Sequence, residues 1–290
     1  MTNIDVFYGD LTANRAYIYA RLPRPADDAG LSLTGTVRGP RCLHAETLPA
    51  QAQLIDLGPG PTLLARAVIT EPCFWTPDLP AIYDVKVHLK RGAETLATIH
   101  CEVGLRAFGK HGCSFLQNGK RWIPRGVSTF STTAKMPRAW HESSAVYVAD
   151  DTNIEAFSEA SQWGALAIVH IDASSNAITD RLRKVSQYPG IALAVILESL
   201  PDDFRKSSVA PNLLLGQFLG PDNCFFIEPW AEFLVIAADS LDHIRDAMSR
   251  QIPIILSRYL SEPCDINVAR AACDELQRDL AAVVHVHLAD

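Results

Sequence analysis

The sequence predicts a multidomain chain of β plus α/β class, with an immunoglobulin-like β-sandwich in residues 1–110 and a reduced TIM (β/α)8-like barrel in residues 111–290. Three observations predict this division. Short alternating runs fill the first part, strand and helix patterns alternate in the second, and a compact series of motifs lies at their boundary. The 290 residues are enough for two modest domains.

Residues 1 to about 105 contain short β-strand candidates that glycine- and proline-rich turns separate. The segment Asp84–Lys90 alternates between polar and apolar residues, which is typical of a half-buried antiparallel strand. No helical pattern interrupts the other runs, which are Tyr17–Leu22, Leu31–Val37, Leu63–Ile69 and Thr95–Val103. About seven short strands with frequent turns indicate a sandwich of immunoglobulin type.

From about residue 120 the pattern changes to strand, helix, strand, helix. Several of the predicted strands are apolar nearly throughout, as strands covered on both faces are. They are Trp122–Val127, Ala145–Ala149, Ala165–Ile171, Ile191–Leu197, Cys224–Ile227, Phe233–Ala237, Pro253–Leu256 and Val283–Leu288. The predicted helices are Asn153–Gln162, Ala177–Ser186, Leu241–Arg250 and Asn267–Ala281. Eight strands with helical connections favour a parallel barrel, and an open doubly wound sheet is the alternative.

The barrel half is short for its architecture. Its length of about 170 residues is below the usual 200 to 250. The first connection, Ser128–Ser144, contains Pro137 and a cluster of serine and threonine, and it shows no clear helix. We therefore expect a reduced barrel whose first helix is missing or degraded.

The composition narrows the partners and the compartment. A net charge of −7 argues against nucleic acid as the main partner, because phosphate binding requires a basic surface. No apolar run approaches the roughly 20 residues that span a bilayer, and no secretory signal is visible at the start. The seven cysteines show no metal-binding spacing. We expect a cytoplasmic protein with free thiols, no cofactor, no bound metal and no membrane contact.

The boundary between the two halves carries four motifs, Trp75–Tyr83, Gly104–Phe108, Phe115–Lys120 and Pro124–Val127. In this order and at this spacing they resemble the junction in glycoside hydrolase family 2, the family of β-galactosidases, β-glucuronidases and β-mannosidases. There a β-sandwich leads into a catalytic (β/α)8 barrel. Two later segments are similar to family segments before strand four and in strand seven, namely Tyr188–Gly190 and Ile252–Tyr259.

The resemblance implies two catalytic glutamates, the acid/base at the end of strand four and the nucleophile at the end of strand seven. Arg258 matches the nucleophile position, where a guanidinium cannot attack an anomeric carbon. The ungapped register places Ser199 at the acid/base position, and a shift of one residue would place Glu198 there. Glu198 is thus either an acid/base or the partner of Arg258 across the barrel mouth. A nucleophilic Tyr259 is the exceptional alternative.

Further candidates follow predicted strands, where barrel enzymes place their catalytic groups. Glu228 and Asp172 are candidate partners of Glu198 in a relocated catalytic pair, although an acid such as Asp172 can also be a helix N-cap. Arg125 is expected to point into the barrel mouth, where it would bind an anion or pair with Glu198. The candidate substrate-binding residues are Arg125, His170, Asp172, Trp230, Arg258 and His285.

Two alternatives concern histidine and tryptophan. His285 and His287 lie on one face of the predicted eighth strand, where the family usually carries a sugar-platform tryptophan. With His170 they could form a metal site, although scattered histidines more often satisfy local hydrogen bonds. Trp140 and Trp230 are candidate ring platforms for a sugar, whereas Trp75 is expected in a core.

Three functions remain open from the sequence. The first is a degenerate carbohydrate-active protein, a pseudoenzyme that binds a saccharide or glycoside ligand or acts as a scaffold. The second is an active glycosidase in which Glu198 works with Glu228 or Asp172. The third is an assembly protein that uses the sandwich as its interface. Whether the chain forms a homo-oligomer is left open.

Overall fold

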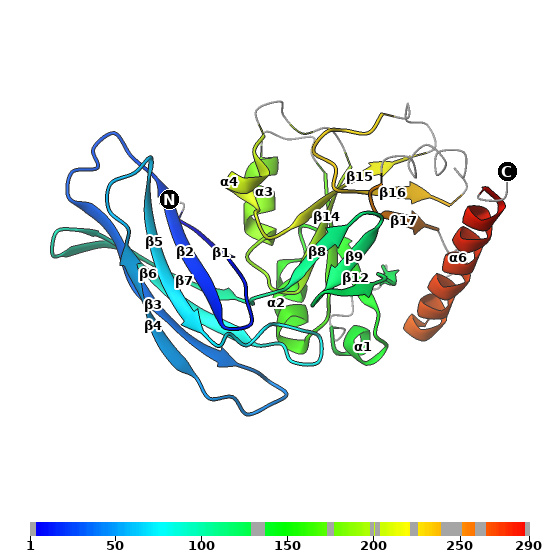
Figure 1. The fold of residues 1–290 in the computed structure, drawn as a ribbon, viewed down its shortest axis with the longest axis horizontal. Helices are drawn as coiled ribbons and strands as arrows, with labels where there is room; N and C mark the ends of the chain where they lie inside the picture. Colours follow the sequence, from blue (N-terminus) through cyan, green and yellow to red (C-terminus); the bar gives the residue numbers. More distant parts are fainter. Residues whose placement is uncertain are drawn as a thin grey trace. The chain divides into compact units, whose positions relative to one another are not determined.

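The computed structural model describes residues 4–128, 137–172, 177–197, 200, 204–220, 226–238, 251–258 and 265–287. The chain forms two compact units. The first contains Met1–Ala107 and Ser186–Pro189, and the second contains Phe108–Val185 and Gly190–Asp290. Figure 1 shows the strands of the first unit in blue and cyan and the mixed strands and helices of the second in green to red.

The first unit is an antiparallel sandwich with the strand order β1-β2-β5-β4-β3-β6-β7. Its strands are β1 (Asp5–Gly9), β2 (Arg15–Pro23), β3 (Leu31–Arg41), β4 (Ala50–Asp56), β5 (Thr62–Thr70), β6 (Ile82–Arg91) and β7 (Glu94–Val103). β4 pairs with β3 through residues Ala50 to Leu54 and with β5 through Ile55 and Asp56. It therefore belongs to both sheets of the sandwich.

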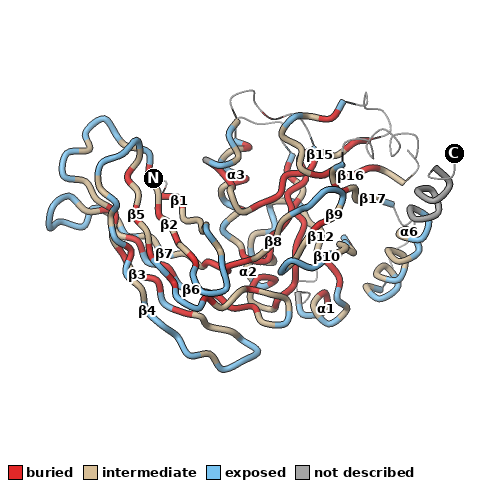
Figure 2. The backbone as a smooth tube through the Cα atoms, in the orientation of Figure 1, coloured by how far each residue is buried: buried red, intermediate tan, exposed pale blue. Residues whose placement is uncertain are grey.

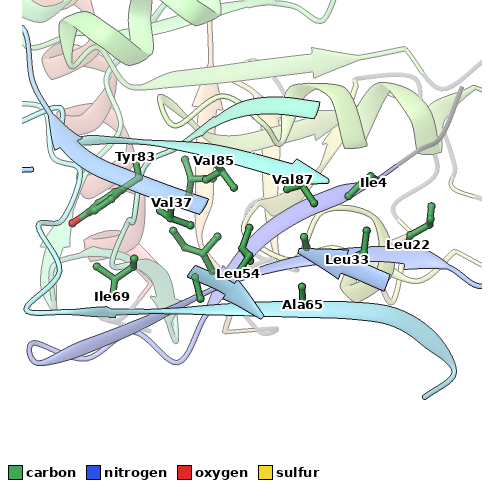
Figure 3. Close-up of a cluster of buried hydrophobic side chains, with 14 of the residues drawn as sticks. Ile4, Leu22, Leu33, Val37, Leu54, Ala65, Ile69, Tyr83, Val85 and Val87 are labelled. Carbon is green, nitrogen blue, oxygen red and sulfur yellow. The ribbon is translucent and has the colours of Figure 1, made fainter. Parts of the chain in front are cut away.

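The alternation predicted from the sequence forms the core of this sandwich. Val85, Val87 and Leu89 of β6 are buried, and the residues between them are not. Figure 3 shows Tyr83, Val85 and Val87 facing side chains such as Ile69 and Ala65 of β5 across the space between the two sheets. The apolar positions of both sheets thus meet in one cluster, as in other sandwiches.

The second unit begins with a small antiparallel sheet of β8 (Phe108–His111), β9 (Ser114–Gln117) and β10 (Lys120–Trp122). Phe115 of β9 is buried, and its ring lies 5.4 Å from the ring of Phe233. A Cβ atom at Gly216 would lie only 2.2 Å from the Phe233 ring. Glycine is therefore required at position 216 so that this aromatic contact can form.

The remainder is a parallel sheet whose strands follow one another in chain order. They are β11 (Gly126–Val127), β12 (Val146–Asp150), β13 (Ala167–Ile171), β14 (Ile191–Ile196), β15 (Leu214–Leu219), β16 (Phe233–Ala237) and β17 (Ile254–Ser257). The helices are α1 (Pro137–Glu142), α2 (Ile154–Trp163), α3 (Ile178–Val185), α4 (Lys206–Val209) and α6 (Ile266–His287). Sequential order is that of a barrel sheet, whereas a doubly wound sheet reverses its order at a switch point.

Helices cover one face of this sheet. Tyr147 of β12 packs its ring against Trp140 of α1 and Phe157 of α2. The register places Val127, Val169, Ala194, Gln217, Leu234 and Leu256 on the same face as Tyr147. The opposite, interior face carries Gly126, Val148, Asp150, His170, Val195, Phe233 and Ser257. Figure 2 shows the buried positions concentrated in these strands, whereas α6 has only intermediate and exposed positions where its side chains are described.

Three sequence predictions change here. The predicted strand Cys224–Ile227 is wrong at its described end, because Phe226 and Ile227 lie in a loop and Leu214–Leu219 forms the strand instead. The predicted strand Val283–Leu288 is wrong as well, because α6 continues to His287. The first connection does contain a helix, the six-residue α1. Leu241–Arg250 lies outside the described residues.

The structure confirms the predicted order of a β-sandwich followed by a TIM-like parallel sheet, which has seven strands among the described residues. The helices that the structure describes include none with the length and apolar character that crossing a bilayer requires.

Candidate functional site

Polar side chains gather where β12 and β13 end. Asp150 and His170 are partners in the register of these two strands, and both lie on the interior face of the sheet. Asp151 directly follows the last residue of β12, and Asp172 directly follows the last residue of β13, Ile171. The carboxyl ends of parallel strands are where barrel proteins build their ligand sites, so these residues define the candidate site.

Asp150 and His170 form the interior part of the site. Burial lowers the pKa of the His170 imidazole, and the Asp150 carboxylate opposes this shift by stabilising the protonated ring. His170 thus favours its neutral form, in which one ring nitrogen donates a hydrogen bond and the other accepts one. Beside it, a carboxylate supplies further acceptors, so the pair can contact several hydroxyl groups of one ligand.

Asp151 forms the second part, together with Arg181 of α3. The Asp151 side chain is only 8% exposed, and its Oδ2 lies 3.4 Å from Nε of Arg181. The Arg181 guanidinium also donates to the carbonyl oxygen of Asp172 at 3.1 Å. Burial raises the pKa of the Asp151 carboxyl, and Arg181 partly offsets this rise. Arg181 therefore joins the ends of β12 and β13.

His170 and Asp172 are residues that the sequence predicts for a site, whereas Asp150, Asp151 and Arg181 are not. Two consecutive acids directly after the apolar run of residues 145–149 were the signal that could have found the first two. Arg181 had no such signal, because the fold alone brings it to Asp151. Asp172 is not the N-cap of α3, since that helix begins at Ile178. Among the described residues, no group of three or more metal-binding side chains lies close enough together to hold an ion.

The two arginines expected at the barrel mouth contact α6 instead. Nη2 of Arg258 donates to Asp279 at 2.7 Å, and both side chains are about half exposed. Arg125 precedes β11 at the amino end of the sheet, and it donates to Asp274 at 2.6 Å and to Gln277 at 3.1 Å. The expectation that Arg125 points into the mouth is therefore wrong. α6 is tied to segments next to both the first and the last strand of the sheet.

Glu228 and Trp230 also lie away from the mouth. The Glu228 N–H donates to Gln217, a helix-face residue of β15, at 2.9 Å. Ile227 packs in the helix-face cluster with Leu219 and Leu234. Trp230 lies in the turn that leads into the amino end of β16. The prediction that Glu228 follows a strand at the mouth is wrong, because Phe226 and Ile227 before it lie in a loop, and Trp230 is not at the mouth either.

The other tryptophan platform is also corrected. Trp140 is 1% exposed, and its indole N–H donates to the carbonyl oxygen of Val127 at 3.1 Å. It is a core residue. Trp75 is buried, as predicted. The remaining predictions cannot be placed, because Glu198, Ser199, Tyr259 and the side chains of His285 and His287 lie outside the described residues.

Comparison with solved structures identifies the fold. The chain is similar to the FMN-binding β-glucuronidase of Facaelibacterium prausnitzii, with a TM-score of 0.60, 14% identity, and coverage of 95% of this chain and 52% of that chain. It is also similar to Bifidobacterium dentium β-glucuronidase complexed with coumarin-3-O-glucuronide, with a TM-score of 0.58, 13% identity, and coverage of 99% of this chain and 57% of that chain. A third similar structure is a β-glycosidase from Bacteroides vulgatus, with a TM-score of 0.61, 11% identity, and coverage of 87% of this chain and 38% of that chain.

At this level of identity the similarity shows the fold alone. The chain spans between 38% and 57% of the length of these three proteins. No protein-family model and no curated protein sequence matches it. The chain therefore has a glycoside hydrolase family 2-like fold, with a β-sandwich followed by a TIM-like parallel sheet.

Proposed function

We propose that the chain is a carbohydrate-active protein that binds a saccharide or glycoside at the carboxyl ends of β12 and β13, without the two-glutamate retaining mechanism. The juxtaposition of Asp150 and His170 on the interior face carries this proposal, because it offers hydrogen-bond donors and acceptors where barrel proteins bind ligands. The likeness to a β-glucuronidase complexed with a coumarin glucuronide supports a sugar as the ligand class.

The orientation of Arg258 supports the loss of hydrolysis. By resemblance this residue stands at the nucleophile position, and its guanidinium pairs with Asp279 on the helix side of the sheet. A guanidinium carries no nucleophilic lone pair at any accessible pH. A saccharide-binding or scaffolding role therefore fits the residues better than double displacement. The domain limits 1–110 and 111–290 and a cytoplasmic location belong to the same proposal.

The second candidate function is an active glycosidase with a relocated pair, in which Glu198 works with Asp172. One observation favours Asp172 over Glu228 as the partner. Asp172 follows β13, which pairs with β14, and Glu198 comes two residues after the end of β14. The two carboxyl groups would need a separation of roughly 5 Å for retention of configuration.

The proposal is tested with aryl glycosides, the glucuronide included, in two assays on the full chain. We expect no turnover above background, and calorimetric binding that His170→Ala and Asp150→Asn abolish. Arg258→Gln is the matched control and should keep the affinity. Turnover that Glu198→Gln abolishes would establish the glycosidase instead. Binding that survives both site variants would contradict the proposed location.

A further inference from the structure

The outer face of one sheet of the sandwich carries an unusual set of cations. In β3 and β6 the residues between the buried positions point away from the core, and in β7 the exposed Thr98 and His100 alternate with the partly buried Ala97, Ile99 and Cys101. The register aligns Thr34 with His88, Thr36 with Lys86, and Lys86 with His100 across the three strands. Arg38 and Lys90 extend this face at its two ends. We call the set of Arg38, Lys86, His88, Lys90 and His100 the cationic face.

Two acids lie on the same face, where the register aligns Asp84 with Arg38 and with Glu102. Asp84 and Glu102 lie beside the cationic face, and Arg41 binds both carboxylates, with its Nε 3.1 Å from Asp84. Within the part of the chain that the structure describes, neither Arg38, Lys86 nor Lys90 has a carboxylate at ion-pair distance. With Arg41 counted, four cationic side chains (Arg38, Arg41, Lys86 and Lys90) stand against two acids, so this face is positive in a chain whose net charge is −7.

The groups of the cationic face act on one another. Burial lowers the pKa of His88, and the positive charges of Lys86 and Lys90 and the neighbouring His100 lower it further. The ring of His88 is held by a 2.8 Å hydrogen bond between its Nδ1 and the Thr98 hydroxyl. A mutually repelling set of cations on a rigid sheet gains free energy when an anionic ligand lies across it.

The dimensions of the cationic face indicate the kind of ligand. Lys86 and Lys90 are four residues apart on one strand, which corresponds to roughly 13 Å. A single small anion cannot contact both, whereas a polymer with repeated negative charges can. Uncharged hydrogen-bonding groups lie among the cations and continue onto β4, namely Thr36, Thr98, Gln51 and Gln53. These groups match a ligand that carries many hydroxyls as well as charges.

We propose that the cationic face binds an anionic polysaccharide, whose carboxylate or sulfate groups pair with Lys86, Lys90 and Arg38 while its hydroxyls contact the threonine and glutamine side chains. The choice of a polysaccharide over other polyanions rests on the proposed carbohydrate function. The cationic face would hold the polymer, and the site at β12 and β13 would bind a single sugar unit.

A matched control lies on the other sheet of the same sandwich. Arg15 and Arg66 stack on the ring of Tyr17 at 5.0 Å and 4.9 Å from its centroid. Among the described residues, no acid lies at ion-pair distance from either. Replacing both by glutamine removes the same charge from the same unit and leaves the cationic face intact.

The experiment measures binding of the full chain to polygalacturonate, dextran sulfate, neutral dextran and double-stranded DNA at low ionic strength. Lys86→Gln combined with Lys90→Gln should weaken binding to one or both acidic polysaccharides about tenfold, because charge pairs with a polyanion dominate such affinities. Arg15→Gln with Arg66→Gln should leave binding within about twofold. The polygalacturonate and dextran sulfate arms distinguish carboxylate from sulfate recognition. Circular dichroism verifies that each variant is folded.

Three results would overturn the inference. They are equal binding of neutral dextran, tighter binding of DNA than of either acidic polysaccharide, and unchanged affinity after the two lysine substitutions. His170→Ala separates this inference from the proposed function, because it should abolish glycoside binding and keep polymer binding. If polymer binding falls with His170→Ala and not with the lysine variant, the cationic face is excluded and the site at β12 and β13 stands.

Discussion

Ion pairs at the carboxyl ends of β12 and β13 differ from those of α6 in how far their acids are buried. Asp151 is almost fully buried beside Arg181, and its pKa is raised by burial. Asp274 and Asp279 of α6 are about half exposed and bind Arg125 and Arg258, and the hydrogen bond from Arg125 is the main cause that lowers the pKa of Asp274. A costly buried carboxylate is typical of a site, whereas exposed pairs fasten one element to another.

The largest expected effect compares a buried side chain of α1 with an exposed side chain of α6 as sources of stability for the second unit. Trp140→Ala should lower the free energy of unfolding of the second unit by about 3–5 kcal/mol, because it removes a fully buried ring and the hydrogen bond to Val127. Val268→Ala on α6 is the control, since Val268 is 59% exposed and should change stability by no more than about 0.5 kcal/mol. Urea unfolding followed by circular dichroism measures both. Similar losses in the two variants would remove the distinction.

A smaller effect compares the ion pairs themselves. Asp151→Ala leaves the Arg181 guanidinium beside a buried, unfilled acceptor site, and it should cost about 1–3 kcal/mol. Arg258→Ala breaks a pair in which both side chains are about half exposed, and it should cost about 0–1 kcal/mol. The same urea titrations at about pH 7 apply. A larger loss for Arg258→Ala would mean that α6 carries the stability of the sheet.

The smallest expected effect is on the pH dependence of stability, which should have opposite signs for variants of Asp151 and of Asp274. The folded-state pKa of Asp151 lies above its ordinary value of 3.8, so its burial penalty is absent at low pH and grows as pH rises through the folded pKa. The folded-state pKa of Asp274 lies below 3.8, so its stabilisation is present above 3.8 and is lost as pH falls through the folded pKa. As pH rises from acid to neutral, the free energy of unfolding of Asp151→Asn should therefore increase relative to that of wild type. The free energy of unfolding of Asp274→Asn should decrease relative to that of wild type. Chemical denaturation across this range checks the signs, and the same sign for both variants would contradict this account.

The sequence analysis predicted the elements whose pattern is local. The alternation in Asp84–Lys90 became a half-buried strand, and the helix before Gly164 ends there with the glycine in the left-handed region. It missed β15 because Gly216 and Gln217 interrupt that apolar run. In the structure, both residues contact segments that are distant in the sequence. Gly216 leaves room for the Phe233 ring, and the side chain of Gln217 binds the backbone of the following loop.

The site was harder to predict because resemblance transfers positions and not geometry. The junction motifs marked the fold well, since a Cβ at Gly104 would lie within 3.0 Å of Trp75 and Pro189 and the three residues therefore pack together. They could not show that Arg125 turns to α6 or that Arg181 reaches Asp151. Those contacts join residues of different elements, and only the register and the packing of the sheet determine them.

Strand β4 has a consequence for how the sandwich comes apart. Its first five residues are hydrogen-bonded into one sheet and its last two into the other. If β4 separates from either sheet, the backbone groups that it pairs with in β3 and in β5 both lose their hydrogen bonds. Amide hydrogens in β3 and in β5 should consequently exchange with solvent only when both sheets open together, which requires a high free energy. The two sheets should therefore unfold as a single cooperative unit rather than as two separable layers.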